Sequence, residues 1–185
     1  MAVDAGLLFV DVGVAAAIFW PALLLIRDTG FYRHEKTRVR CSPPPWMFGI
    51  VWMIMYGLIT AAAILHLHTA GSIDHHVDGW YQAIVALFIV NITLNHYWSV
   101  AFFGESRTLW VLFVLLVVLG TAIAEVVLYA IVEQWWSFGL YLVYPIWLLY
   151  ALCLNFAWWR MEQGIKNKKA DSNIEITGVN YATRR

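Results

Sequence analysis

Five long apolar segments alternate with shorter polar ones along the chain. They cover roughly residues 5–26, 46–69, 80–103, 108–132 and 136–160. Each reaches the length of about 20 apolar residues that is needed to cross the hydrocarbon core of a membrane. Because backbone groups in lipid must bond internally, each segment is predicted to be an α-helix. The pattern predicts an all-α integral membrane protein, in which residues 1–160 form a bundle of five transmembrane helices and residues 161–185 form a polar, flexible C-terminal tail.

Composition agrees with this class, since 62% of residues are hydrophobic and 13% are charged, whereas about a quarter are charged in soluble domains. All 12 Lys and Arg residues fall in the first loop, the third loop or the tail, which share one side after five crossings. Basic residues accumulate on the cytoplasmic side. The distribution predicts an N-terminus outside and a cytoplasmic C-terminus. The first segment begins MAVD, without a basic n-region, so we expect a helix and not a cleaved signal peptide.

Aromatic and amide side chains recur at helical spacing in three of the segments. Those that share a face are Trp52 and Tyr56 in the second segment, Asn91, Asn95, Trp98 and Phe102 in the third, and Trp147, Ala151, Asn155 and Trp158 in the fifth. A rise of about 1.5 Å per residue places most of them at one depth, about 8–14 Å from the basic side. Aromatic walls with a few convergent polar groups favour a pocket for a flat, apolar ligand.

Spacing alone leaves a second interpretation open for these residues. Tryptophan near an interface usually anchors a helix, and asparagine in a membrane helix usually bonds to a neighbouring helix. For the tryptophans nearest the segment ends, we expect the anchoring role: Trp20, Trp80, Trp135, Trp136, Trp158 and Trp159.

The second segment begins with three consecutive prolines, Pro43 to Pro45. Proline has no N–H, so the run leaves no unsatisfied donor at the mouth of a helix, and Pro45 suits the first helical position. Because such a run is stiff and extended, it could hold residues 27–45 across the bundle as a lid. Gly49 is expected to allow a backbone or ligand to approach closely.

Ionisable groups inside the apolar segments are few. Glu125 lies about 10 Å from the nearer end of its segment, where reaching the interface or pairing is favoured over a proton relay. Asp11 is interpreted in the same way, with no partner identified. His96 is interpreted as a hydrogen-bonded helix contact in preference to a haem ligand.

No catalytic or metal site is predicted. The polar stretch from His66 to Asp78 contains imidazoles and carboxylates, but their spacing fits no metal signature, so a solvated loop is favoured. No lysine occurs between 37 and 165, which excludes a retinal Schiff base there, and no phosphate loop or activated nucleophile is found. The two cysteines define no disulfide framework.

Three motifs resemble those of the translocator protein, or tryptophan-rich sensory protein (TspO), family. The second segment, CSPPPWMFGIVWMIMY, follows the family pattern through its prolines, Trp46, Gly49, Trp52 and Tyr56. The third carries LNHYWSVAFFG from Leu94 to Gly104. The fifth matches at the following positions: Trp147, Tyr150, Leu154, Asn155 and Arg160. The resemblance covers about residues 41 to 160.

The resemblance implies a membrane protein, commonly a homodimer, that binds porphyrins such as protoporphyrin IX or haem, and other hydrophobic ligands such as sterols, without requiring a cofactor. Carried over by position, the ligand-binding residues would be Trp46, Phe48, Gly49, Trp52, Asn95, Trp98, Trp147, Ala151 and Asn155. The resemblance also implies a location, which is the mitochondrial outer membrane or another organelle membrane in a eukaryote and the cell membrane in a bacterium.

The chain departs from the family pattern at several places. Cys41 and Ile50 replace a tryptophan and a proline, and Phe156 stands at the tyrosine position of a proposed cholesterol motif. These differences leave two alternatives open. One is a structural accessory subunit of a larger membrane complex, and the other is an enzyme that degrades porphyrin in light.

Overall fold

The computed structural model describes residues 11–19, 39, 42–72, 79–103 and 109–182, and these residues form five helices and no strand. The helix over residues 11–19 falls within the first predicted segment, whose remainder lies outside the described residues. The other four are α3 (Pro45–Ser72), α4 (Gly79–Phe103), α5 (Leu109–Ile131) and α6 (Trp135–Ala182). Their starting positions lie within one residue of those predicted from hydropathy.

All four of these helices are long and apolar enough to cross a membrane. The apolar stretches are Trp46–Thr69, Gly79–Phe102, Leu109–Ile131 and Trp135–Lys168. Large apolar side chains cover their outer faces, as shown by Ile89 at 57% and Phe113 at 53% exposed. Such surfaces are stable when they contact lipid, so the chain is an integral, multi-pass membrane protein.

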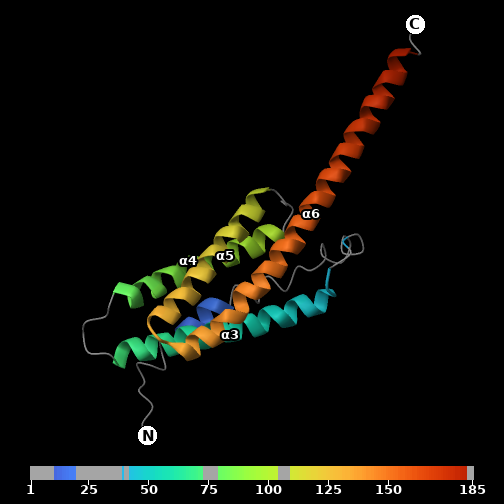
Figure 1. Ribbon diagram of the computed structural model, residues 1–185. Helices are drawn as coiled ribbons and strands as arrows, with labels where there is room; N and C mark the ends of the chain where they lie inside the picture. Colours follow the sequence, from blue (N-terminus) through green and yellow to red (C-terminus); the bar gives the residue numbers. More distant parts are fainter. Residues whose placement is uncertain (1–10, 20–38, 40–41, 73–78, 104–108, 183–185) are drawn as a thin grey trace.

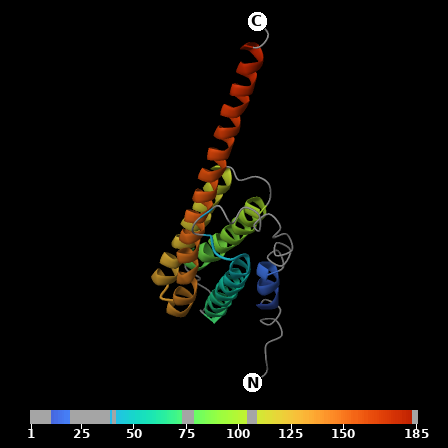
Figure 2. The same cartoon turned by 90° about the vertical axis from the view of Figure 1, so that its right-hand side faces the viewer.

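The helices pack as an open series in which α4 contacts α5, α5 contacts α6, and α6 contacts α3. Direct contact between α3 and α4 is sparse. The helix over residues 11–19, blue in Figures 1 and 2, lies beside α3 and α4 on this open side. The interior of the series is filled by side chains from α3 to α6, and it contains the aromatic residues discussed below.

Helix α3 starts at Pro45, as the proline run predicts. The carbonyl oxygen of Pro44 accepts from the amides of Met47 and Phe48 at 3.0 and 3.4 Å, so the hydrogen bonds of the helix begin in its first turn. Just before the prolines, the Ser42 hydroxyl accepts a hydrogen bond from Trp158 Nε1 at 3.1 Å. This bond fastens the segment that leads into α3 to the distant part of α6.

A tight turn with two backbone hydrogen bonds joins α5 to α6. The Glu133 amide donates to Ala130 and the Gln134 amide to Tyr129, which is the pattern of a Schellman C-cap. Glu133 takes the left-handed conformation of this motif, with φ of 57°, although it is not glycine. The turn reverses the chain within three residues, so α6 packs antiparallel to α5.

The segment after residue 160 is not an irregular tail in this structure, because α6 continues without interruption to Ala182. Figure 1 shows this part of α6, in red, projecting beyond the other helices. Its first turns contain an i,i+4 ion pair between Lys166 and Glu162 at 2.9 Å. A helix that has already formed can be extended one residue at a time, which costs far less than nucleating a new helix. Hydropathy predicted an end near residue 160, so α6 is longer than predicted.

Candidate functional site

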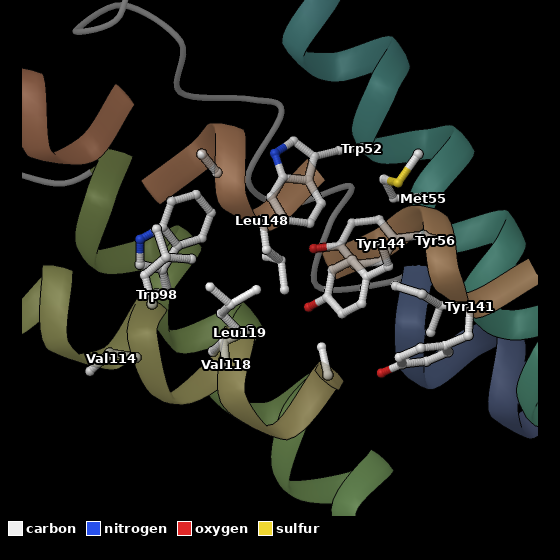
Figure 3. Close-up of a cluster of buried hydrophobic side chains, with 14 of the residues drawn as sticks. Trp52, Met55, Tyr56, Trp98, Val114, Val118, Leu119, Tyr141, Tyr144 and Leu148 are labelled. Carbon is white, nitrogen blue, oxygen red and sulfur yellow. The ribbon is translucent and has the colours of Figure 1, made fainter. Parts of the chain in front are cut away.

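Three tryptophans from α3, α4 and α6 meet inside the bundle. The ring centroids of Trp52 and Trp98 are 5.7 Å apart, and those of Trp52 and Trp147 are 6.3 Å apart in an edge-to-face arrangement. Phe48 packs edge-to-face on Trp147 at 5.6 Å. We call Phe48, Trp52, Trp98 and Trp147 the aromatic cluster. Figure 3 shows Trp52 and Trp98 converging on Leu148.

The aromatic stacking continues from this cluster toward the basic side of the bundle. Trp98 stacks on Phe102 with centroids 5.1 Å apart, and Phe102 stacks on Trp158 at 5.3 Å. Trp158 is only 1% exposed and bonds to Ser42, so the prediction that it anchors the helix in the interface is wrong. Trp80, Trp135 and Trp136 are 51%, 62% and 84% exposed, as expected for anchoring residues.

Buried hydrogen-bond donors without partners gather at the aromatic cluster. The indole Nε1 atoms of Trp52, Trp98 and Trp147 are buried and have no partner within the described part of the chain. Asn155 lies two turns after Trp147 on the same face of α6. Its Nδ2 atom is likewise buried and has no hydrogen-bond partner among these residues. Ala151 lies between them and is 1% exposed. Most buried polar groups in proteins have partners, so three unpartnered indole donors in the cluster, and a fourth donor further along the same face of α6, call for an explanation.

Asn95 differs from these groups, because its amide already has partners in the protein. Its Oδ1 atom accepts from the Tyr56 hydroxyl at 2.9 Å, and its Nδ2 atom donates to the Tyr144 hydroxyl at 2.7 Å. The Tyr144 hydroxyl in turn donates to Asn91 Oδ1 at 3.1 Å. Asn91 Nδ2 donates to Thr121 at 2.7 Å, which ends the chain on α5. The five residues form a polar network that links α3, α4, α5 and α6.

Sequence reasoning placed Asn95 on the right face but did not find Tyr144. The signal was available, since Tyr144 lies three residues before Trp147 and therefore on nearly the same helical face. What the sequence cannot supply is the direction of the hydrogen bonds, which depends on how deeply α6 packs against α4. A contact between Asn95 and a ligand would have to use its remaining N–H or displace one of its two tyrosine partners.

Two of the predicted site residues lie away from the aromatic cluster. Trp46, in the first turn of α3, is 64% exposed and points outside the packed interior. At Gly49, an added Cβ would meet no atom of the described residues within 4 Å, so nothing approaches this glycine closely here. The proposed lid over residues 27–45 lies mostly outside the described residues.

A separate cavity of about 430 Å³ lies beside the aromatic cluster. It opens between the helix over residues 11–19, α3 and α4, and its walls include Ile18, Ile84, Phe88 and His96. None of the nine predicted site residues lines it. Tyr56 separates it from the cluster, because its ring stacks on Trp52 at 5.4 Å and contacts His96 at 5.8 Å.

The histidines take structural roles where the structure describes them. His96 bonds through Nε2 to the Ile18 carbonyl at 3.1 Å, which confirms a helix contact. His66 contacts Gln134 Oε1 at 2.8 Å, and His68 contacts Asp11 at 3.0 Å, which supplies the partner of Asp11. Residues 73–78 of the polar loop lie outside the described residues. No group of three potential metal ligands occurs among the residues that the structure describes.

The comparisons with known proteins agree with this architecture. The model of the TspO/MBR family matches residues 10–160. The chain is 32% identical to Protein CrtK of Rhodobacter capsulatus over 154 residues, covering 83% of this chain and 88% of that protein. It is 31% identical to the human Translocator protein over 124 residues, covering 66% and 69%. It is 32% identical to Tryptophan-rich protein TspO of Archaeoglobus fulgidus, covering 63% and 70%. The chain therefore belongs to the TspO/MBR family.

Proposed function

We propose that this protein binds flat, largely apolar ring ligands at the aromatic cluster, and that porphyrins such as protoporphyrin IX or haem are the main class. The observation that carries the proposal is the set of unpartnered donors on Trp52, Trp98, Trp147 and Asn155. A porphyrin offers a planar surface for stacking on indole rings, together with carboxylates that accept hydrogen bonds. It would therefore supply acceptors for these donors and a further ring for the indoles to stack on.

Binding requires the cluster to open, because Trp52 and Trp98 are 8% and 0% exposed. Trp147 is the best placed to move, since it is only partly buried and its contacts with Trp52 and Phe48 are edge-to-face. We take Phe48, Trp52, Trp147, Ala151 and Asn155 as the walls of the opened pocket. Trp98 would form its floor, and Asn95 would hold the floor in position through the polar network.

The proposal describes a receptor or sensor, and it requires no catalytic group. Other apolar ligands, including sterols, could occupy the same pocket through stacking and dispersion contacts. We place the N-terminus outside and the C-terminus in the cytoplasm, on the basis of the twelve Lys and Arg residues. A homodimer is the proposed assembly, by analogy with the family.

Equilibrium titration with protoporphyrin IX, followed by porphyrin absorbance in purified protein, tests the proposal. We expect saturable, micromolar binding, which corresponds to about −8 kcal/mol. Trp147→Ala should weaken binding at least tenfold, or about 1.4 kcal/mol, because one stacking surface and one donor are lost. Porphyrin absorbance is used because the substitution itself alters tryptophan fluorescence.

The matched control is Trp136→Ala, on the same helix but 84% exposed, and it should bind like the wild type. Equal weakening in both variants would contradict the pocket assignment and indicate non-specific adsorption to the membrane-facing surface. Absence of binding in the wild type would favour the accessory-subunit alternative. One observation supports that alternative, namely the extension of α6 to Ala182, beyond the family match that ends at residue 160.

A further inference from the structure

Glu125 is the only Asp, Glu, Lys or Arg in residues 45–72, 79–103, 109–131 and 135–159. It lies in α5 and is 0% exposed. This burial rules out one of the two expectations for Glu125, namely that its side chain reaches the interface. Neither of its carboxyl oxygens has a hydrogen-bond partner within the described residues. A buried group of this kind in a membrane helix is a candidate for function, because keeping it there is costly.

Three tyrosines lie near the carboxyl group of Glu125. Tyr129 lies one turn later on α5, while Tyr141 and Tyr144 come from α6, and all three interact electrostatically with Glu125. The Tyr141 hydroxyl is near enough to interact with the carboxyl group, although it does not meet strict hydrogen-bond geometry. The hydroxyls of Tyr129 and Tyr141 have no other hydrogen-bond partner within the described residues. Figure 3 shows Tyr141 and Tyr144 directed into the same interior.

This arrangement suits a site that binds a proton. A tyrosine hydroxyl can either donate or accept, depending on its rotation. Tyr129 and Tyr141 could therefore accept from the neutral acid, or donate to the carboxylate, without moving their rings. Burial in a medium of low dielectric strongly favours the neutral form when no cation is near.

The surrounding helices supply no permanent cation. The base that contacts one of the three tyrosines is His66 on α3, whose ring lies against that of Tyr129 with centroids 5.7 Å apart. On α4, the polar groups nearest this region are the uncharged amides of Asn91 and Asn95. Both amides are hydrogen-bonded to the Tyr144 hydroxyl. Arg160 lies about seven turns along α6 from its first residue, Trp135, at the other end of the bundle.

Tyr144 connects the Glu125 site to the aromatic cluster. Its ring packs edge-to-face on Tyr141 at 5.5 Å, and its hydroxyl accepts from Asn95. Asn95 accepts from Tyr56, whose ring stacks on Trp52. This series of two ring contacts and two hydrogen bonds runs from Tyr141 to Trp52, so a ligand that reorients Trp52 would alter the surroundings of the carboxyl group.

We propose that Glu125 is a proton-binding site inside the membrane and that it is linked through Tyr144 to occupation of the aromatic cluster. In the empty protein the carboxyl group holds its proton. The linkage rests on the proposed ring-ligand function, whereas the proton-binding site itself does not. Thermodynamic linkage is reciprocal. If ligand binding changes the proton affinity of Glu125, then protonation of Glu125 changes the affinity for the ligand by the same factor.

Infrared difference spectroscopy tests both parts on the purified protein in lipid. At neutral pH, we expect the wild type to show the carbonyl stretch of a protonated carboxylic acid that shifts in D₂O. Glu125→Gln, which preserves the shape of the side chain, should abolish that band. Glu133→Gln is the matched control, since Glu133 is an exposed carboxyl group in the turn after α5, and it should retain the band. A wild type without the band, or a band that survives in Glu125→Gln, overturns the proton-binding site.

The second part adds protoporphyrin IX to saturation, with binding monitored by porphyrin absorbance. We expect the Glu125 band to shift in the wild type and to stay in place in Tyr144→Phe. Bound porphyrin with an unshifted wild-type band overturns the linkage. If no porphyrin binds, the proposed function fails, together with the linkage, and the band in the empty protein still decides the proton-binding site.

Discussion

Replacing Trp98 with alanine is expected to lower the free energy of unfolding by about 3–5 kcal/mol. Trp98 is 0% exposed and contacts Trp52 on one side and Phe102 on the other. Because these neighbours belong to α3 and α4, they can close only partly over the space that the indole leaves. Unfolding in mixed detergent micelles, followed by circular dichroism, measures the loss.

Trp80→Ala is the matched control for this substitution, since Trp80 is on the same helix but 51% exposed. It should change the unfolding free energy by no more than about 0.5 kcal/mol. A similar loss in both variants would show that the packing around Trp98 contributes no more to the free energy of unfolding than an exposed tryptophan does. That result would contradict the central position of the aromatic cluster in the fold.

Tyr144→Phe should lower the free energy of unfolding by about 2 kcal/mol, since it removes one hydroxyl and leaves two buried groups without partners. Those groups are Asn95 Nδ2 and Asn91 Oδ1, which bond to the Tyr144 hydroxyl at 2.7 Å and 3.1 Å. The same unfolding measurement applies. Combining Tyr144→Phe with Asn95→Leu should cost less than the sum of the two single changes, because the pair shares one hydrogen bond.

Thr60→Val provides a control that also removes a buried hydroxyl. The Thr60 Oγ1 atom has no partner among the described residues, so its removal should leave the stability unchanged or slightly higher. Equal effects of Thr60→Val and Tyr144→Phe would show that the polar network adds no stability beyond the shape of its side chains. Interhelical hydrogen bonds in membranes vary widely in strength, so the difference between the two variants is the informative quantity.

Hydropathy predicted the membrane class and the starts of four helices, because length and apolar content are local properties of the chain. Helical spacing also placed Trp52, Trp98 and Trp147 on faces that could meet, and the structure brings them together. The same spacing could not separate Trp158 from an anchoring tryptophan. Its burial depends on Ser42, which is 116 positions away in the sequence.

The environment of Glu125 also could not be predicted from the neighbouring sequence. Counting residues from the end of α5 suggested that its side chain could reach the interface, since depth is the only quantity that the sequence supplies. Its burial depends on tertiary packing, which brings Tyr141 and Tyr144 near it from α6 after the tight turn at Glu133. The length of α6 was missed for the opposite reason, because a polar segment can remain helical when it continues an established helix.

The structure of the protein with protoporphyrin IX bound, determined in a lipid environment, tests ring-ligand binding at the aromatic cluster most directly. We expect a porphyrin ring in contact with Trp52 and Trp147, and porphyrin carboxylates within hydrogen-bond distance of an indole Nε1 or of Asn155 Nδ2. We also expect Trp147 to change position relative to its present contact with Phe48. A porphyrin found on the lipid-facing surface near Trp136, or in the cavity beside His96 with the cluster still closed, would contradict the account.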